Sequence, residues 1–300
     1  MKDVLSYHAG ELAVQERAGV GTEGLAAGDM YRPSMPTGVQ RFLAMQQLAI
    51  LSTQDADGRV WASMRSGLPG FLRALDPTKV EIGGYSHPDD PLLTNLATPS
   101  LTGMLAIQLA ARQRIRLNGT AQLRLDGKIV LTTQQVYGNC PQYIQARAVI
   151  GERPASVTAA GASSRLDTRL RHWIEQADTL FIATAHPESG ADASHRGGRP
   201  GFIRVEDETR LLVPDYSGNR MFNTLGNLAA YPQAGLLLPD FQSGAALQLS
   251  GSAQILWDDP RMKDFAGAQR LLSFDIARVI ELPQATQLQF DFQGFSPTLP

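Results

Sequence analysis

The run Ser194-His195-Arg196-Gly197-Gly198 combines side chains that can bind an anion. An arginine offers a planar fork of N–H donors that suits a phosphate, a serine adds a neutral donor, and glycines let backbone N–H groups approach a ligand closely. The alternative is an exposed loop with scattered charge, because these residues contribute little to a packed core. The run therefore predicts either an anion-binding cradle or a surface loop.

A second, degraded copy of this run lies earlier in the chain. The stretch LAILSTQDADGRVWASMRSGLPGF, from Leu48, aligns with TLFIATAHPESGADASHRGGRPGF, from Thr179. Ser63 falls on Ser194 and Phe71 on Phe202, a shift of 131 in both pairs (194 − 63 and 202 − 71). Further along, Asn95 aligns with Asn227 at a shift of 132. A nearly constant shift over most of a domain predicts a tandem duplication.

Each copy has the pattern of a small β-rich unit with one or two helices. Helical runs at 38–47 and 165–176 lead into short apolar strands, each followed by a turn. Later in each copy come further strands and a helix, at 90–98 or 219–231. This order predicts a mainly β (α+β) fold with two tandem, six-stranded antiparallel barrels.

We expect four segments along the chain: an N-terminal extension (1–36), a first barrel domain (37–137), a helix and linker (138–164) and a second barrel domain (165–300). In the third segment, Asn139 as a cap and Pro141 in the first turn predict the helix. Its second half is rich in Ala, Ser and Gly, which is typical of a linker.

Composition restricts the partners. The chain has 27 Lys and Arg against 29 Asp and Glu, so its bulk charge gives no attraction to nucleic acid or an anionic membrane. Cys140 is the only cysteine, which excludes an internal disulfide framework and argues against a Cys-rich metal site. No stretch approaches the roughly 20 apolar residues of a membrane span, and the N-terminus lacks a signal-peptide pattern. We expect a soluble, cytoplasmic protein without a bound metal.

Several phrases resemble the pyridoxamine 5'-phosphate oxidase-related FMN-binding proteins. In the second copy these are SHRGGRPGF, VPDYSGNRMFNTLGNLAAYPQAGLLL and LQLSGSAQILW. In the first copy, GRVWASMRSGLPGF and VYGNCPQYIQAR resemble a subgroup in which such units occur in tandem or fused to other redox modules. The resemblance spans the chain from about Tyr31 and implies split β-barrels with FMN in the groove between them. For a chain with two barrels it implies an intramolecular pseudo-dimer, and a homodimer of such chains stays open as well.

The resemblance also implies which residues hold the cofactor in the second copy. The run along the ribityl phosphate and the strand-to-helix turn that supplies phosphate donors correspond to Ser194, His195, Arg196, Gly197, Asn219, Arg220, Asn223 and Thr224. A turn that enters a helix leaves N–H groups unpaired, which independently favours an anion there. An ordinary Asn-capped helix with an apolar face is the alternative.

The first copy keeps only part of this site. Ser63 and Arg65 match the second copy, so we count both as candidate cofactor contacts. Asp89 and Asp90 follow where the second copy has its phosphate donors, and their charge would repel a phosphate. We therefore expect one FMN per chain, with the first barrel forming the other wall of the groove.

The resemblance implies a flavin-dependent oxidoreductase with an unidentified small-molecule substrate or redox partner. We name no catalytic residue, because the cofactor itself carries out such chemistry. No histidine follows His195 and the last arginine is Arg278, which argues against oxidation of pyridoxamine phosphate. Two alternatives stay open: a flavin-binding or stress protein without turnover, and a haem-binding or haem-degrading protein on the same fold.

Two further features have competing interpretations. Cys140 is either a simple buried thiol or a reactive thiol near the flavin. Arg112, Arg114 and Arg116 alternate along a predicted strand and so share one face. We expect that face to be solvated, with a flavin or partner contact as the alternative.

Overall fold

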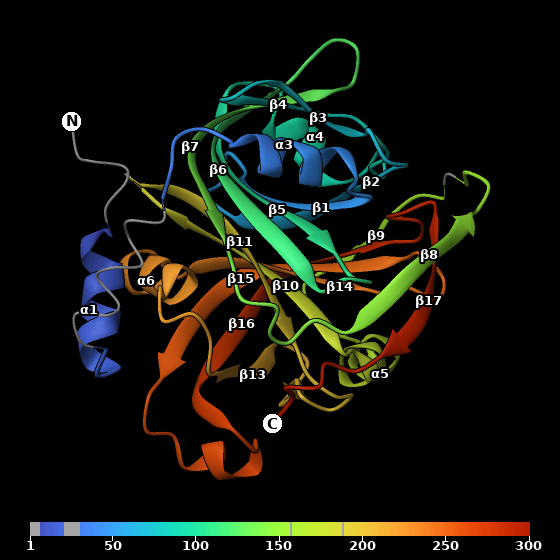
Figure 1. Cartoon of the computed structure of the whole chain (residues 1–300). Coiled ribbons are helices and arrows are strands. Elements are labelled where there is room, and N and C mark those ends of the chain that lie inside the picture. Colours follow the sequence, from blue (N-terminus) through green and yellow to red (C-terminus); the bar gives the residue numbers. More distant parts are fainter. Residues whose placement is uncertain (1–6, 21–30, 157, 188) are drawn as a thin grey trace.

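The computed structural model describes residues 7–20, 31–156, 158–187 and 189–300 (Figure 1). The first half contains α1 (Ala9–Arg17), α3 (Thr37–Ala44), β1 (Leu48–Gln54), β2 (Val60–Ser66), β3 (Leu72–Asp76), β4 (Lys79–Ile82), α4 (Pro91–Asn95), β5 (Ser100–Gln108), β6 (Gln113–Leu123), β7 (Ile129–Gly138) and β8 (Ala146–Glu152). The second half contains β9 (Gly161–Ser163), α5 (Thr168–Gln176), β10 (Thr179–His186), β11 (Gly190–Gly197), β12 (Arg204–Val205), β13 (Arg210–Tyr216), α6 (Asn223–Ala230), β14 (Gln233–Pro239), β15 (Ala246–Leu256), η2 (Pro260–Asp264), β16 (Ala268–Leu282) and β17 (Leu288–Gly294). None of the described helices is long and apolar enough to cross a bilayer.

The two halves contain the same sheet. The first sheet has the strand order β2-β1-β5-β6-β7-β4-β3, and the second repeats it as β11-β10-β14-β15-β16-β13-β12, with β9 added beside β16. This agreement confirms the predicted fold of two tandem split barrels. Each sheet has seven strands in this order rather than the predicted six. The additional strand is β3 or β12, a short strand after the Pro-Gly-Phe phrase that pairs only with its hairpin partner.

The two barrels share an apolar core. One cluster contains Leu48, Ile50 and Met64 of the first barrel together with Phe181 and Leu237 of the second, all at most 2% exposed. Their strands are apolar on both faces because one face is covered by their own barrel and the other by its partner. The contacts are reciprocal: β11 packs on β5 and β6, while β2 packs on β14 and β15. This reciprocity is that of a dimer built within one chain.

Two glycines lie where the backbones of the two barrels pack directly against each other. A Cβ on Gly103 would lie 2.6 Å from the Cα of Asp192, and a Cβ on Gly235 would lie 2.7 Å from the Cα of Trp61. The two glycines are equivalent in the repeat (235 − 103 = 132), and so are their neighbours (192 − 61 = 131). Only glycine lets the two backbones meet at this distance.

The first barrel closes at a point where the second stays open. Ser66 and Tyr85 exchange two backbone hydrogen bonds, of 3.2 and 2.7 Å. The equivalent residues, Gly197 and Tyr216, form no such bridge, and both line a pocket. A Cβ on Gly197 would lie 2.2 Å from the carbonyl oxygen of Tyr143. The chain that leaves the first barrel therefore runs along the open split of the second.

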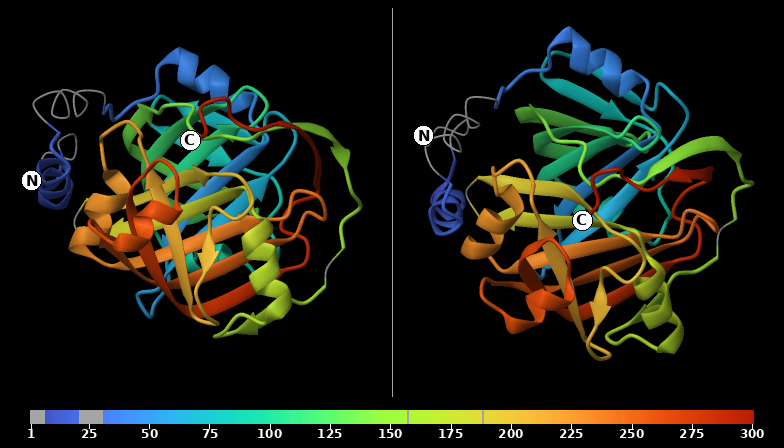
Figure 2. Two further views of the ribbon diagram at one scale, coloured as in Figure 1. Left: turned by 90° about the horizontal axis from the view of Figure 1, so that it is seen from below. Right: turned by 60° about the horizontal axis from the view of Figure 1, so that its bottom comes forward.

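The predicted helix at Asn139 and Pro141 is wrong. The described residues of 138–164 contain no helix; instead β8 pairs with β17 near the C-terminus, and β9 pairs with β16. In Figure 2 the β8–β17 pair forms a two-stranded ribbon along one side of the molecule. This long-range pairing satisfies backbone groups that a helix would have satisfied locally. Local capping signals therefore gave no sign of it.

The N-terminal helix α1 lies against α6 of the second barrel (Figure 1). A Cβ on Gly226 would lie 2.6 Å from the Cα of Glu11, so these helices meet at backbone distance. The segment Ala18–Val20, just beyond α1, reaches the open split of the second barrel. Residues 1–6 and 21–30 of the predicted N-terminal extension lie outside the described residues.

Candidate functional site

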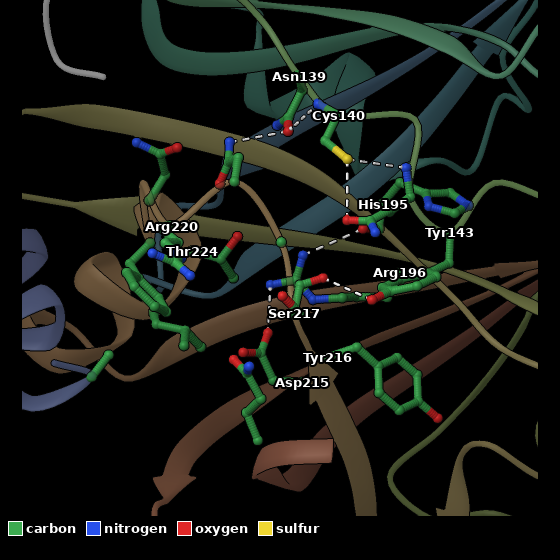
Figure 3. Close-up of a pocket in the computed structure, with 18 of the residues that line it drawn as sticks. Asn139, Cys140, Tyr143, His195, Arg196, Asp215, Tyr216, Ser217, Arg220 and Thr224 are labelled. Carbon is green, nitrogen blue, oxygen red and sulfur yellow. Dashed lines mark hydrogen bonds and ion pairs between the residues drawn. The ribbon is translucent and has the colours of Figure 1, made fainter. Parts of the chain in front are cut away.

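A pocket fills the open split of the second barrel, and we call it the split pocket (Figure 3). Its walls come from β11, β13, β16 and α6 of the second barrel, from β6 of the first barrel, from the segment 139–143 and from Ala18–Val20. Its cavity volume is about 220 Å³, below the roughly 300–1,000 Å³ that is typical of small-molecule sites. The pocket is open to solvent, so a cofactor-sized ligand would extend beyond this enclosed space.

Seven of the ten residues that the sequence analysis proposed as cofactor contacts line this pocket. They are His195, Arg196, Gly197, Asn219, Arg220, Asn223 and Thr224. Ser194 lies behind the pocket wall, while Ser63 and Arg65 are in the first barrel, away from the pocket. The second copy of the repeat thus supplies the predicted residues together, and the first copy does not.

Ser194 anchors the wall of the pocket. Its hydroxyl is fully buried, accepts hydrogen bonds from Arg116 (2.5 Å) and Thr224 (2.9 Å), and donates one to Asp192 (2.9 Å). All of its hydrogen-bonding capacity is in use. Ser194 therefore ties β11 to β6 and α6 instead of presenting a donor to a ligand.

The split pocket is rich in positive charge. Its lining includes five arginines, and Asp215 is the one acidic residue among the described lining residues. The arginines are Arg114, Arg116, Arg196, Arg220 and Arg270. Asp215 forms ion pairs with Arg196 (3.3 Å) and Arg270 (3.1 Å), and Asp192 behind the wall lies 3.5 Å from Arg116. The five arginines therefore outnumber the two carboxylates, Asp215 and Asp192, that lie close enough to neutralise them.

Arg114 carries the clearest sign of a missing partner. Its side chain is buried, and its Nη2 donates to the carbonyl oxygen of Gln142 (2.8 Å). Its Nε and Nη1 are buried and have no hydrogen-bond partner within the described part of the chain. Burial lowers the pKa of Arg114 to about 9, and repulsion by Arg116 and Arg196 contributes to the shift. Unpaired donors on a buried cation are costly, and an anionic ligand would remove that cost.

The position of Arg114 and Arg116 corrects a sequence-based expectation. These residues do alternate along β6 and share a face, but that face is buried against the second barrel instead of solvated. The second barrel buries this face by packing against it, and the sequence of β6 alone does not indicate that contact. At the shift of 132, Arg114 and Arg116 correspond to Ala246 and Gln248, so the repeat distinguishes these two arginines as a feature of the first copy alone.

His195 is neutral in this environment. Burial lowers its pKa well below the usual range, and the positive charges of Arg114 and Arg196 lower it further. The ring packs edge-on against Phe181, with 5.5 Å between ring centres. Neither ring nitrogen has a hydrogen-bond partner within the described residues. His195 can therefore offer a ligand a neutral donor or acceptor, but no charge.

The turn that enters α6 adopts an unusual backbone. Arg220 and Phe222 have φ values of 59° and 60°, a region that residues other than glycine rarely occupy. Such backbone strain clusters at functional sites. The turn is held by Asn219, which donates to Asn139 (3.0 Å) and accepts from the backbone N–H of Met221 (3.1 Å). It directs the N-terminus of α6, which favours negative charge, toward the pocket.

The segment after the first barrel supplies residues that were not among the proposed contacts. Cys140 is half-buried at the pocket, and its thiol lies 3.2 Å from Gln142 Oε1 (Figure 3). The Tyr143 ring contacts the Tyr216 ring edge-on at 5.4 Å, and its hydroxyl donates to the Ser217 carbonyl oxygen (2.9 Å). Cys140 is therefore accessible from the pocket. The two tyrosines form an aromatic wall.

In the first barrel, the Asp90 carboxylate fills the place that is equivalent to the anion site of the second barrel. The Asp90 carboxylate is 2% exposed and accepts hydrogen bonds from Ser63 Oγ (2.6 Å), the Leu92 N–H (2.9 Å) and Gln248 Nε2 (3.2 Å). Arg65 donates to the carbonyl oxygens of Gly84 and Gly127, both at 3.0 Å. Asp90 thus accepts the hydrogen bonds that a bound anion would otherwise accept. This arrangement gives a structural reason for the predicted loss of the first site.

The described residues contain no group of three or more His, Cys, Asp or Glu side chains placed to hold a metal ion.

Comparison with known proteins identifies the second barrel. Residues 166–294 match the model of the family described as Pyridoxamine 5'-phosphate oxidase. This match confirms, for the second barrel, the resemblance inferred from its sequence phrases. No curated protein matches the chain.

Several solved structures are similar to parts of the chain. HupZ from Group A Streptococcus has 10% identity and a TM-score of 0.33, with 41% of this chain and 98% of that chain covered. A putative pyridoxamine 5'-phosphate oxidase from Lactobacillus delbrueckii has 16% identity and a TM-score of 0.32, with 39% and 94% covered. An FMN-binding protein from Syntrophomonas wolfei has 12% identity and a TM-score of 0.27, with 37% and 86% covered.

Proposed function

We propose that this chain, whose second barrel matches the pyridoxamine 5'-phosphate oxidase family model, binds one FMN in the split pocket and acts as a flavin-dependent oxidoreductase. The observation that supports this proposal most directly is Arg114. It is a buried cation with two unpaired N–H groups, in a pocket where arginines outnumber carboxylates. A phosphate-bearing ligand supplies the negative charge and the acceptors that this site lacks.

The chain's own residues divide the work of holding such a ligand. Arg114 and Arg196 would pair with the phosphate, and the N-terminus of α6, at Asn223 and Thr224, would add backbone donors. Tyr143 and Tyr216 offer aromatic surface for a planar ring. Bound FMN would supply the transfer of electrons or hydride, and the protein would supply binding, orientation and electrostatics.

The C-terminal strand argues for a substrate other than pyridoxamine phosphate. The tail after Arg278 contains no histidine or arginine, and its strand β17 pairs with β8 and does not line the split pocket. We propose a small molecule other than pyridoxamine phosphate as the substrate or redox partner. A chain with Cys140 as its only cysteine needs no oxidising compartment, so we propose that it works in the cytoplasm.

The absorbance spectrum of the purified protein, with and without added FMN, tests the proposal. We expect the visible bands of bound oxidised flavin, which disappear when a reductant is added under nitrogen and return with oxygen. A Soret band after addition of hemin, with no flavin bound, would favour the haem-binding alternative. If flavin binds but no tested pair of reductant and acceptor gives catalytic turnover, the non-enzymatic flavin carrier would be favoured.

A further inference from the structure

A second cleft is lined by residues of helix α5 and of the β8–β17 ribbon, and we call it the α5 cleft. Both elements can be followed in Figure 2. It shares no lining residue with the split pocket. Four aromatic side chains line it: Trp173, Phe241, Phe290 and Phe292. Phe292 is 46% exposed, while Phe241 is buried and packs edge-on against Phe290 with 5.0 Å between ring centres. The cleft therefore offers an aromatic surface that is open at one side.

Arg147 lies among these rings. Its guanidinium carbon is 4.4 Å from the ring centre of Phe241 and 5.3 Å from that of Phe292. The side chain is 10% exposed, and its Nη2 lies 2.5 Å from the Asp178 carboxylate. Its Nη1 is buried and has no hydrogen-bond partner in the part of the chain that the structure describes. Arg147 is thus held in place on one side and has a free donor on the other.

The other two arginines of the cleft already form structural contacts through both terminal nitrogens. Arg153 donates to the carbonyl oxygens of Leu288 (2.7 Å) and Gln242 (2.9 Å). Arg169 forms a two-point ion pair with Glu281 on the surface, at 2.8 and 2.6 Å. Among these three arginines, Arg147 is the one with a buried donor that lacks a partner within the described residues.

We propose that the α5 cleft is a second ligand site, which binds a small planar aromatic anion such as an aromatic carboxylate. The ring of the ligand packs among Trp173, Phe241 and Phe290, and its carboxylate pairs with Arg147 Nη1. Nη1 has already lost its contact with water, so this pairing requires no further desolvation of the donor. To reach Nη1 the ligand must displace the half-exposed Phe292 ring, which packs edge-on against Phe295 with 5.0 Å between ring centres. The proposal does not depend on flavin binding at the split pocket.

Calorimetric titration of the full-length protein with 2-naphthoate and with its neutral analogue 2-naphthamide tests this site. We expect the carboxylate to bind about tenfold tighter than the amide, or more, because it alone forms a charge-assisted hydrogen bond. Arg147→Gln should reduce the affinity for 2-naphthoate to that for the amide. Arg147→Lys keeps a charge beside Asp178 and should retain part of the preference, which separates lost binding from lost folding.

Two controls locate the binding. Arg169→Gln changes an arginine of the same cleft that is already paired with Glu281, and it should leave both affinities unchanged. Saturating FMN should not displace 2-naphthoate. The proposal is overturned if 2-naphthoate does not bind, if Arg147→Gln leaves the preference for the carboxylate intact, or if FMN competes with the probe.

Discussion

Arg116 of the first barrel donates a hydrogen bond of 2.5 Å to Ser194 Oγ of the second barrel. The equivalent contact runs the other way, where Gln248 of the second barrel donates one of 3.2 Å to Ser63 Oγ of the first. The pairs correspond in the repeat (248 − 116 = 132 and 194 − 63 = 131). Both barrels thus keep the same crossing contact, but one side presents an arginine and the other a neutral amide. The contact with Arg116 lies at the positively charged split pocket, and the contact with Gln248 lies at the closed place in the first barrel.

This asymmetry predicts one flavin per chain. Asp90 already occupies the donors of the first site, and the Ser66–Tyr85 bridge closes the first barrel. Titration with FMN, followed by calorimetry, should saturate near one equivalent. Two equivalent sites of equal affinity would contradict this interpretation of the first barrel.

Arg114→Met should separate ligand binding from stability. The substitution removes a buried cation with unpaired donors, so the flavin-free protein should gain roughly 1–4 kcal/mol in its free energy of unfolding. FMN affinity should fall at least about tenfold, because a contact with the phosphate is lost. Urea unfolding and FMN titration of the same variant measure both effects. A destabilised variant with unchanged FMN affinity would show that Arg114 is structural.

Arg196→Ala should weaken FMN binding by about ten- to a hundredfold, which corresponds to the loss of roughly 1.5–3 kcal/mol from a charge-assisted contact. The affinity for riboflavin, which lacks the phosphate, should barely change. Arg65→Ala makes the matched change in the first barrel. Because Arg65 donates to the carbonyl oxygens of Gly84 and Gly127, that variant should be less stable but should bind FMN normally once folded. Equal losses for FMN and riboflavin in Arg196→Ala would indicate general damage to the pocket.

Gly103→Ala and Gly235→Ala should each destabilise the protein by about 1–3 kcal/mol, because the new methyl group would meet the backbone of the opposite barrel. Gly38→Ala is the control, since a Cβ there meets nothing within 4 Å and the residue lies in helix α3. That change should stabilise the protein by roughly 0.5–1 kcal/mol. The midpoints of urea unfolding distinguish these outcomes. Two unaffected glycine variants would show that the barrels do not meet at this distance.

Glu11 of α1 should make stability depend on pH. Burial raises the pKa of its carboxyl from its usual 4.5 to about 7, although the backbone N–H of His8 and the Asn223 amide donate to it. The folded protein then keeps a proton that the unfolded chain releases, so stability is lost as pH rises from about 4.5 to about 7. Relative to Glu11→Gln, the wild type should lose up to roughly 3 kcal/mol over this range.

The measurement for Glu11 is the free energy of unfolding of both proteins in urea, between about pH 4 and pH 8. The Asp192 charge also raises the pKa of Glu11, and the Tyr31 hydroxyl lies 3.5 Å from the carboxylate, so Tyr31→Phe serves as a control for the surrounding hydrogen bonds. A difference between wild type and Glu11→Gln that does not change with pH would show that Glu11 ionises normally.

The repeat was visible in the sequence because it consists of local patterns that occur twice. Matching residues such as Ser63 and Ser194, Gly70 and Gly201, or Asn95 and Asn227 keep their spacing, and each folds the same turn, strand end or helix in its own copy. The phrase around Arg196 and the turn before Asn223 are recognisable in the sequence for the same reason. Alternation and capping are properties of neighbouring residues, so the sequence contains them.

Contacts between distant segments determined the rest. Arg114 looked like part of a solvated face because the sequence does not show that the second barrel covers β6. The segment after Asn139 looked helical because its partner strand, β17, lies almost 150 residues further along the chain. Whether a charge is buried, and whether it finds a partner, depends on which surfaces meet in three dimensions. The sequence therefore determined the two barrels. Only the tertiary structure decided that the split of the second barrel forms a pocket while the equivalent place in the first barrel is closed.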